Sequence, residues 1–158
     1  MITQRIITIL GIALLLSGQS ADYNYTDTID EAFEQTTLII SSSTHACYVF
    51  DTYLALTNEQ RRRGLMFVRE LPEFSGMLFA YRQSAFLSIW MKNTYIPLDL
   101  LFIHADGRIA NIVRDAQPHT LDSRVAAERV NYVLEINGGV AAKLGIDNDS
   151  RVIFALVD

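Results

Sequence analysis

Short hydrophobic runs separated by polar turn residues follow one another along most of the chain. They predict strands over residues 37–40, 47–56, 77–81, 86–92, 99–104, 108–114, 131–136 and 151–157. Short strands at this spacing are typical of a sandwich or barrel, and the first run is expected to pair with the second. The pattern therefore predicts a mostly β domain, β-barrel-like or a sandwich, with one or two short helices.

Two of the segments between these strands predict short helices. Thr57 and Gln60 form a capping-box pattern, in which each side chain satisfies a backbone N–H group of the other residue, so a helix should begin there. Gly64 suits the end of this helix, because glycine tolerates the positive φ found just beyond a last turn. We interpret the arginines at 61–63 as that solvated last turn, in preference to an anion site. Residues 140–144, followed by a glycine, predict one or two further helical turns.

The hairpin over residues 98–113 has the clearest turn signal in the sequence. Asp106 and Gly107 lie between two hydrophobic runs. We expect this pair to supply the positive φ angles that a tight turn of the primed type requires.

Residues 1–20 have the features of a secretory signal peptide. Arg5 precedes an uncharged hydrophobic run over residues 6–16, and the small residues Gly18 and Ser20 suit cleavage after position 20. Because the run is about half as long as the roughly 20 residues of a membrane span, we favour cleavage over an uncleaved anchor. We therefore expect export to the periplasm or the extracellular space, with no stable membrane span after cleavage.

Behind this leader the sequence predicts one domain. Residues 21–43 are acidic and rich in turn formers, which predicts a flexible stem, and residues 44–158 form the expected β domain. The short strand at 37–40 would extend the folded part to about Thr36. At 158 residues and 50% hydrophobic content the chain can bury one core but not two full domains. A formal net charge of −5 without a basic stripe disfavours nucleic acid as a partner.

Strong motifs for catalysis or metal binding are missing from the sequence. It contains no glycine-rich phosphate loop, no nucleophile elbow and no paired Cys or His residues at metal-ligand spacing, so no cofactor is expected. Cys47, the single cysteine, is interpreted as a buried thiol because it lies in a hydrophobic run. Met66, Met77 and Met91 could bind Cu(I), but their hydrophobic neighbours favour a role in the core.

Residues 90–99 run from a hydrophobic strand directly into polar residues. This segment contains the motifs Trp-Met-Lys-Asn-Thr and Ile-Pro-Leu-Asp. Further motifs are Gly-Leu-Met at 64–66, Gly-Met-Leu-Phe at 76–79 and Val-Leu-Glu-Ile-Asn-Gly-Gly at 133–139. Together they resemble the domain of unknown function 192 family (DUF192) over roughly residues 46–154. The resemblance implies a compact β-barrel-like or sandwich fold, often behind a signal peptide, and no established activity.

The same segment supplies the components of a binding site. Trp90 offers a flat face for stacking, Lys92 a positive charge, and Asn93 and Thr94 hydrogen bonds, while Asp99 adds a carboxylate. An aromatic surface surrounded by polar groups suits a sugar or another small polar metabolite.

Strand alternation bears on how these residues are used. It places Trp90 and Lys92 on one face of their strand and Met91 on the other, so the first two could share an open face. A purely structural interpretation carries comparable weight, because Lys92 could form a partly buried ion pair with Asp99 or Glu135.

Three functions are therefore open, and we favour the first. It is an exported envelope domain that binds a small polar or glycan ligand near residues 90–99. The second is a hydrolase-like enzyme in which Asp99 or Glu135 acts as general acid or base beside Lys92, which requires both carboxylates to reach one substrate. The third is a protein-interaction module without a small ligand, recognisable by an exposed apolar patch of several hundred Å².

Overall fold

The computed structural model describes residues 25–154. In this part of the chain the elements are, in order, α1 (Tyr25–Ala32), β1 (Glu34–Ser41), β2 (Cys47–Ala55), α2 (Asn58–Arg63), β3 (Ser75–Ala85), β4 (Ser88–Ile89), β5 (Leu98–Ile103), β6 (Ile109–Ala116), β7 (Arg124–Val125), β8 (Val130–Asn137), α3 (Val140–Lys143) and β9 (Arg151–Phe154). The mostly β fold class predicted from the sequence is confirmed. The predicted leader, residues 1–20, lies outside the described residues, among which no helix is long and apolar enough to cross a membrane.

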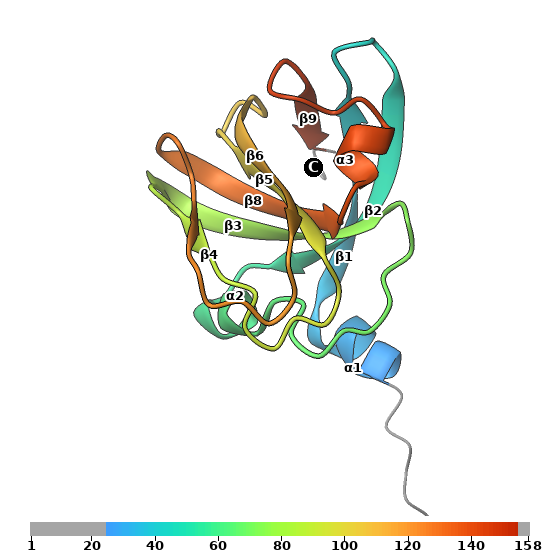
Figure 1. Ribbon diagram of the computed structural model, residues 1–158, viewed down its shortest axis with the longest axis vertical. Coiled ribbons are helices and arrows are strands. Elements are labelled where there is room, and N and C mark those ends of the chain that lie inside the picture. Colours follow the sequence, from blue (N-terminus) through green and yellow to red (C-terminus); the bar gives the residue numbers. More distant parts are fainter. Residues whose placement is uncertain (1–24, 155–158) are drawn as a thin grey trace, which may run out of the picture.

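One large sheet curls into a half-barrel (Figure 1). Its seven strands follow the order β6-β5-β8-β3-β2-β1-β9. Neighbouring strands run antiparallel except β2 and β3, which are parallel. Parallel neighbours cannot be joined by a tight turn, so the chain crosses from β2 to β3 through α2 and a long loop. This crossover places α2 at one end of the sheet.

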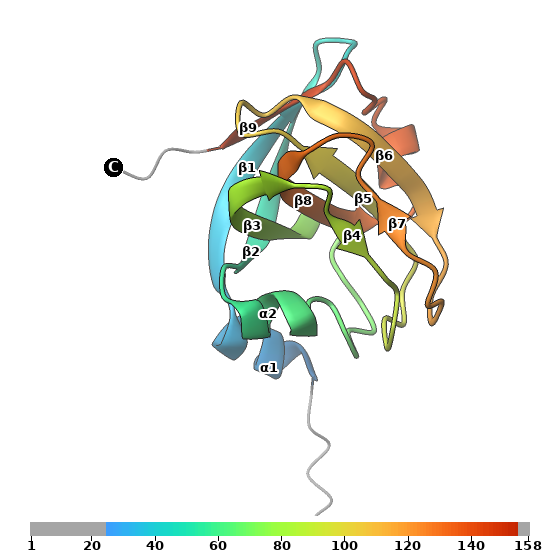
Figure 2. The ribbon, with the colours of Figure 1, turned by 90° about the vertical axis from the view of Figure 1, so that its left-hand side faces the viewer.

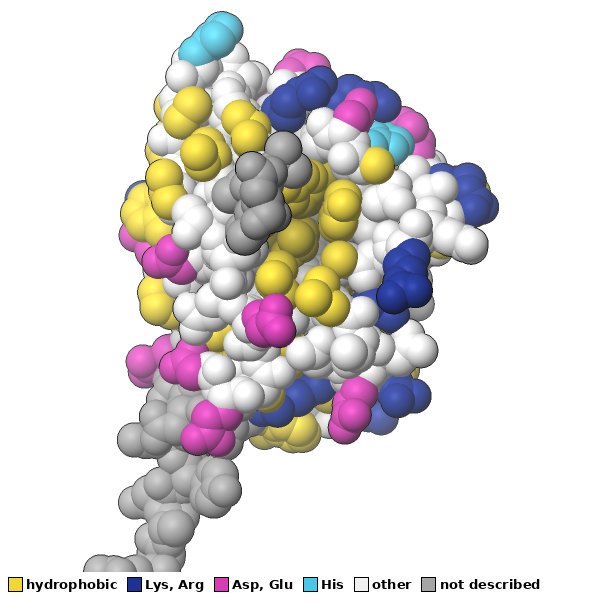
Figure 3. Space-filling model, turned by 180° about the vertical axis from the view of Figure 1, so that it is seen from behind, with side chains coloured by type: hydrophobic (Ala, Val, Ile, Leu, Met, Phe, Trp, Pro, Cys, Tyr) yellow, Lys and Arg dark blue, Asp and Glu magenta, His cyan; other side chains and the backbone are white. Residues whose placement is uncertain are grey.

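The curled sheet is closed at the tip of the β5–β6 hairpin. The carbonyl oxygen of Gly107 accepts a hydrogen bond from the N–H group of Val152 at 2.9 Å, and Arg108 and Arg151 form an isolated β-bridge. Gly107 has a φ of 85°, and a Cβ atom there would lie 2.0 Å from the carbonyl oxygen of Val152. Glycine is therefore required both by the backbone angle and by space. Hydrophobic side chains remain visible in a hollow on the back of the molecule (Figure 3).

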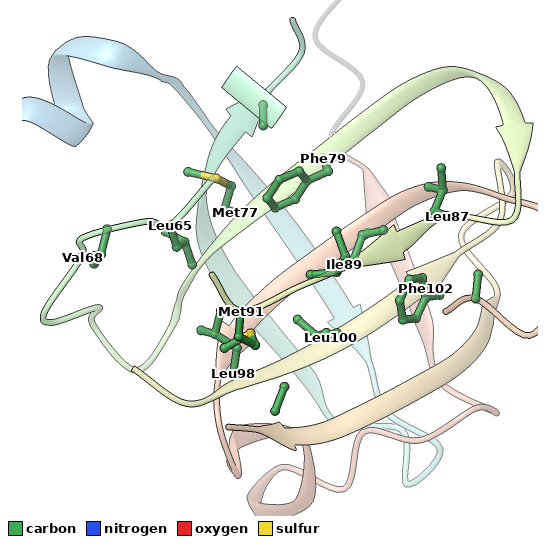
Figure 4. Close-up of a cluster of buried hydrophobic side chains, with 14 of the residues drawn as sticks. Leu65, Val68, Met77, Phe79, Leu87, Ile89, Met91, Leu98, Leu100 and Phe102 are labelled. Atoms are coloured by element: carbon green, nitrogen blue, oxygen red, sulfur yellow. The ribbon is translucent and has the colours of Figure 1, made fainter. Parts of the chain in front are cut away.

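Hydrophobic side chains are buried on both faces of the large sheet. The cluster inside the curl draws on both edges of the sheet and on α3, and includes Leu38, Ile40, Phe50, Leu101, Leu134, Val140 and Val152. The cluster on the other face lies between β3, β8 and β5 and the chain around β4 (Figure 4), and includes Leu65, Met77, Phe79, Ile89, Met91 and Leu100. A small two-stranded sheet, β4 with β7, covers this second cluster (Figure 2).

The strand predicted over residues 86–92 is regular over two residues only. These two residues form β4, which pairs with β7 in a sheet separate from the large one. Ser88 lies opposite Val125, and Ile89 lies opposite Arg124. The predicted alternation nevertheless continues along the whole segment. Leu87, Ile89 and Met91 are buried, whereas Phe86 and Trp90 are exposed.

The predicted helix starts and ends are confirmed. The Gln60 N–H group donates to Thr57 Oγ1 at 3.1 Å, and the Thr57 N–H group donates to Gln60 Oε1 at 3.0 Å, which completes the capping box of α2. Gly64 follows α2 with a φ of 47°. α3 is the predicted second helix, and Gly145 follows it with a φ of 66°.

The turn of the β5–β6 hairpin differs from the prediction. Gly107 has a positive φ, but Asp106 does not. The N–H group of Gly107 bonds to the carbonyl oxygen of His104 at 3.0 Å. The turn is thus wider than a two-residue primed turn, with the glycine in the left-handed position that follows the turn.

The described part of the predicted stem, residues 25–43, contributes to the folded domain, which therefore begins before residue 44. β1 lies between β2 and β9 in the large sheet, and its pairing with β2 confirms the expected partner of the run at 37–40. Ahead of it, α1 was not expected from the sequence. Ile29 and Phe33 are buried against the second cluster, which explains why this acidic segment is ordered there.

Candidate functional site

A pocket lies between α2 and the chain around β4, which face the same side of the molecule (Figure 2). Its cavity volume is about 80 Å³, and it opens to solvent on one side. Four parts of the chain form its walls, namely α2 with the loop that follows, β3, the segment 88–94 and β8. The polar and aromatic lining residues are Arg61, Arg62, Arg63, Phe79, Tyr81, Ser88, Trp90, Lys92, Thr94 and Glu135.

Glu135 supplies a buried carboxyl group to this pocket. Its residue is 4% exposed, and in the sheet it lies opposite Met77 of β3 and Leu100 of β5, both fully buried. No hydrogen bond or ion pair joins the carboxyl group to another described residue, and its oxygens are not among the fully enclosed side-chain atoms without a partner, so they reach the space of the pocket. Burial raises the pKa of Glu135 to about 8, because the apolar surroundings disfavour the ionised form. Near neutral pH the pocket therefore holds a neutral carboxyl group, which can both donate and accept a hydrogen bond.

Trp90 and Lys92 lie at the open side of the same pocket. Trp90 is 52% exposed, and Lys92 Nζ is 5.4 Å from the centroid of its ring. The two side chains share the open face expected from strand alternation, while Met91 between them is fully buried. A partly solvated indole next to an ammonium group can contact both an apolar face and a polar group of a ligand.

Thr94 and Asn93 differ in how they relate to the pocket. Thr94 lines it and is buried, with its hydroxyl 3.5 Å from the carbonyl oxygen of Lys92. Asn93 is not among the lining residues. Its backbone has a φ of 56°, and its carbonyl oxygen accepts a hydrogen bond from the N–H group of Phe67 at 2.8 Å. The structure therefore gives Asn93 a role in shaping the turn after Lys92.

Three loops meet beside this turn, and each contains a non-glycine residue with a left-handed backbone. These residues are Phe67, Asn93 and His119, with φ values of 67°, 56° and 60°. The N–H group of His119 bonds to the carbonyl oxygen of Thr94 at 3.2 Å, and Tyr95 packs against the rings of both Phe67 and His119. Such backbone conformations persist only where the surrounding contacts hold them. The junction fixes the position of the Lys92–Thr94 turn at the pocket.

Arg61 holds α2 in place beside the pocket. Its guanidinium group donates to the carbonyl oxygens of Leu56 and Ala80, at 2.5 and 2.8 Å, and lies 4.7 Å from the centroid of the Tyr81 ring. Burial raises the pKa of Tyr81 above its ordinary value, while the nearby charge of Arg61 acts in the opposite direction. The arginines of α2 were interpreted from the sequence as a solvated last turn, and Tyr81 was not singled out. The arginines and Tyr81 come together at the pocket only because of the crossover between β2 and β3, and no local sequence motif predicts that crossover.

Asp99 lies away from the pocket. It is fully buried, and its two carboxylate oxygens each accept a backbone N–H group at 2.8 Å, from Asp115 and from Ala141 at the start of α3. In the sheet Asp99 lies opposite Ile136, so its side chain is on the face opposite to that of Glu135. The structure therefore does not assemble the acid–base pair that the hydrolase interpretation required, nor an ion pair between Lys92 and Asp99.

The sulfur-containing residues divide between core and surface. Met77 and Met91 are fully buried, as a core role predicts, while Met66 lines the pocket. Cys47 is exposed, so its interpretation as a buried thiol is wrong: it begins β2 on the outer face of the sheet. Within residues 25–154 no three His, Cys, Asp or Glu side chains come close enough together to hold a metal ion.

The fold and the pocket define a small β domain with a partly open polar pocket beside α2 at one end of a half-barrel. Residues 39–154 match the model of the DUF192 family, described as "Uncharacterized ACR", and the chain belongs to this family. Several solved structures are similar, among them the following two. A protein of Sinorhizobium meliloti described as a "putative transcription regulator" is 34% identical, with a TM-score of 0.76 over 77% of this chain and 95% of that one. A protein of unknown function from Novosphingobium aromaticivorans is 36% identical, with a TM-score of 0.74 over 77% and 86%. No curated protein matches the chain.

Proposed function

We propose that this protein is an exported domain that binds a small polar or glycan ligand in the pocket between α2 and residues 88–94. The observation that carries the proposal is the Glu135 carboxyl group. It is 4% exposed, faces the pocket and has no partner among the described residues. A carboxyl group that lines a pocket is ordinarily satisfied by a hydrogen bond from water or from a ligand, because the protein supplies none to it here. A bound ligand would satisfy it.

The other lining groups fit the same ligand class. A pyranose ring has an apolar face of C–H groups and an edge of hydroxyl groups. Trp90 offers an exposed ring for the former, and Thr94, Lys92 and Glu135 offer hydrogen-bond partners for the latter. Trp90 is half exposed and Glu135 is buried, and both line the same pocket.

Export is supported by the sequence of residues 1–20, with its basic start, hydrophobic run and small residues before the expected cleavage point. The domain contains a single cysteine and so needs no disulfide for stability in an oxidising compartment. Saccharides of the cell envelope are the ligands that such a location makes available. The net charge of −5 disfavours nucleic acid.

A second candidate function is favoured by one feature of the small sheet. Phe86, Trp90 and Val125 are 60%, 52% and 50% exposed. Ser88 lies opposite Val125, and Phe86 and Trp90 are two positions from Ser88 along an alternating segment, so all three side chains lie on the outer face. An apolar surface of this kind can also bind a protein partner.

Fluorescence and thermal-shift titrations of residues 21–158 would test the proposal. Trp90 is the only tryptophan of the chain, so its emission reports on the pocket directly. We would screen envelope saccharides, peptidoglycan fragments, nucleotides and Cu(I). A ligand that changes Trp90 emission should raise the melting temperature of the wild type but not of Trp90→Ala or Lys92→Ala.

Phe86→Ala is the matched control, because Phe86 is an exposed aromatic residue on the same face that does not line the pocket. It should bind the small ligand like the wild type. If Phe86→Ala and Trp90→Ala lost binding equally, the outer face of the small sheet would be the binding surface and the pocket would not. Failure of every polar compound to bind would contradict the proposal.

A further inference from the structure

The charges that line the pocket are almost all positive. Its walls carry the four cations Arg61, Arg62, Arg63 and Lys92, and Glu135 is the single acidic residue among the lining side chains. The chain as a whole has a formal net charge of −5, so the pocket reverses the overall sign. Cations that surround a concave site focus a positive potential there and attract anions.

The side chains of two of these cations, Arg62 and Lys92, form no hydrogen bond or ion pair within the described part of the chain, and that of Lys92 contacts the ring of Trp90. Arg61 is held by backbone carbonyl groups of the chain on either side of the crossover. Arg62 and Lys92 are exposed and approach the pocket from different elements. An anionic group between them would receive charge-assisted hydrogen bonds, which are about twice as strong as neutral ones.

Glu135 in the pocket is compatible with an anion only in its neutral form. A carboxylate there would repel a negative ligand, whereas a carboxylic acid donates a hydrogen bond to a ligand oxygen. Burial raises the pKa of Glu135 to about 8, which keeps the group protonated near neutral pH.

We infer that the ligand of this pocket is a small anion such as a sugar acid or a phosphorylated sugar, whose negative group lies against Arg62 and Lys92 while one of its oxygens accepts a hydrogen bond from Glu135. The inference rests on the proposed function and specifies the ligand class of the same site.

Several other ionisable groups line the same pocket as Glu135. They are the three arginines of α2, Tyr81 of β3 and Lys92. Arginine keeps its charge at all accessible pH values, and burial raises the pKa of Tyr81 above its ordinary value of 10.0, so Tyr81 stays neutral in the range of interest. The neighbouring strands present Met77 and Leu100, which do not ionise. We therefore expect the ionisation of Glu135 to weaken anion binding as the pH rises.

The test compares sugars that share one ring and differ in charge. Glucose is neutral, glucuronate is negative and glucosamine is positive. Comparing glucose 6-phosphate with glucuronate shows whether the site prefers a phosphate or a carboxylate. Isothermal titration of residues 21–158 should show at least about tenfold tighter binding of glucuronate or glucose 6-phosphate than of glucose. Between about pH 7 and pH 9 anion affinity should fall about tenfold, because the protonated fraction of a group with a pKa near 8 falls by that factor.

Two variants separate the roles of the charges. Glu135→Gln keeps a hydrogen-bond donor but cannot ionise, so it should bind the anion with an affinity that does not change between about pH 7 and pH 9. Combining Arg62→Met with Lys92→Met should remove the preference for the anion. Lys143→Met should leave it unchanged, because Lys143 is exposed, pairs with Glu73 and lies outside the pocket.

The outcomes distinguish this inference from the proposed function. If glucose binds as tightly as the anions, or if glucosamine binds most tightly, the inference is overturned. The proposed function is still supported in that case, provided that Trp90→Ala loses the binding of the sugar. Anion binding that persists unchanged at about pH 9 in the wild type would also overturn it. If no sugar and no other polar compound binds, both proposals fail.

Discussion

Replacing Glu135 by glutamine should stabilise the folded protein, and the gain should grow with pH. In the unfolded chain this carboxyl group ionises near its ordinary pKa of 4.5, whereas burial raises the pKa in the folded state to about 8. Between these values the unfolded state has released a proton that the folded state still holds. The free energy of unfolding therefore falls as the pH rises from about 4.5 through 8, by about 1.4 kcal/mol per pH unit. The accumulated loss is about 5 kcal/mol above pH 8, a large part of the 5–15 kcal/mol that stabilises a typical domain.

Urea denaturation of the wild type and Glu135→Gln at about pH 5, 7 and 9 measures this effect. The two free energies of unfolding should agree within about 1 kcal/mol at the lowest pH and differ by about 4–5 kcal/mol at the highest. Glu70→Gln is the control, because Glu70 is an exposed carboxylate in the loop after α2 and should follow the wild type at every pH. Parallel profiles for the wild type and Glu135→Gln would refute the assignment of a buried, neutral Glu135.

Three further predictions concern the framework of the fold. Gly107→Ala should lower the free energy of unfolding by about 3 kcal/mol or more, as measured by urea denaturation. Gly139 has a similar φ of 84° but open space around its Cβ position, so Gly139→Ala should lower it by about 1 kcal/mol. Equal costs would contradict the steric role of Gly107. Asp99→Asn should lower the free energy of unfolding by about 2–4 kcal/mol, because an amide has one acceptor oxygen where the carboxylate has two. The affinity for the ligand should not change. Thr57→Ala should lower stability by about 1 kcal/mol and Thr57→Ser should restore it; thermal denaturation of both would show whether the cap matters.

The elements of the fold that depend on local sequence were predictable. Hydrophobic runs located the long strands within a few residues, and the capping box located α2. The helix α1 was missed because its sequence is acidic and its order depends on burying Ile29 and Phe33 against distant strands. The segment 86–92 shows the converse. Its alternation of burial was correct, but its partner is the short β7, so regular pairing ends after two residues.

The candidate site was predictable in its composition but not in its assembly. Trp90, Lys92 and Thr94 are neighbours in sequence, and the structure keeps them together. Asp99 and Glu135 were equivalent at the sequence level, since each is a carboxylate within a hydrophobic strand. The register of β5 against β8 puts them on opposite faces, and register between distant strands cannot be read from either segment alone.

The pairing of β1 with β9 has a consequence for how the chain is made. Leu38 of β1 lies opposite Phe154 of β9, so the two strands come from opposite ends of the described chain. A nascent chain that has not yet reached residue 151 has no partner for that edge of β1, and unpaired strand edges associate with other chains. Contacts between residues so distant in sequence also form slowly. The domain therefore completes its sheet late in synthesis, when residues 151–154 become available to pair with β1.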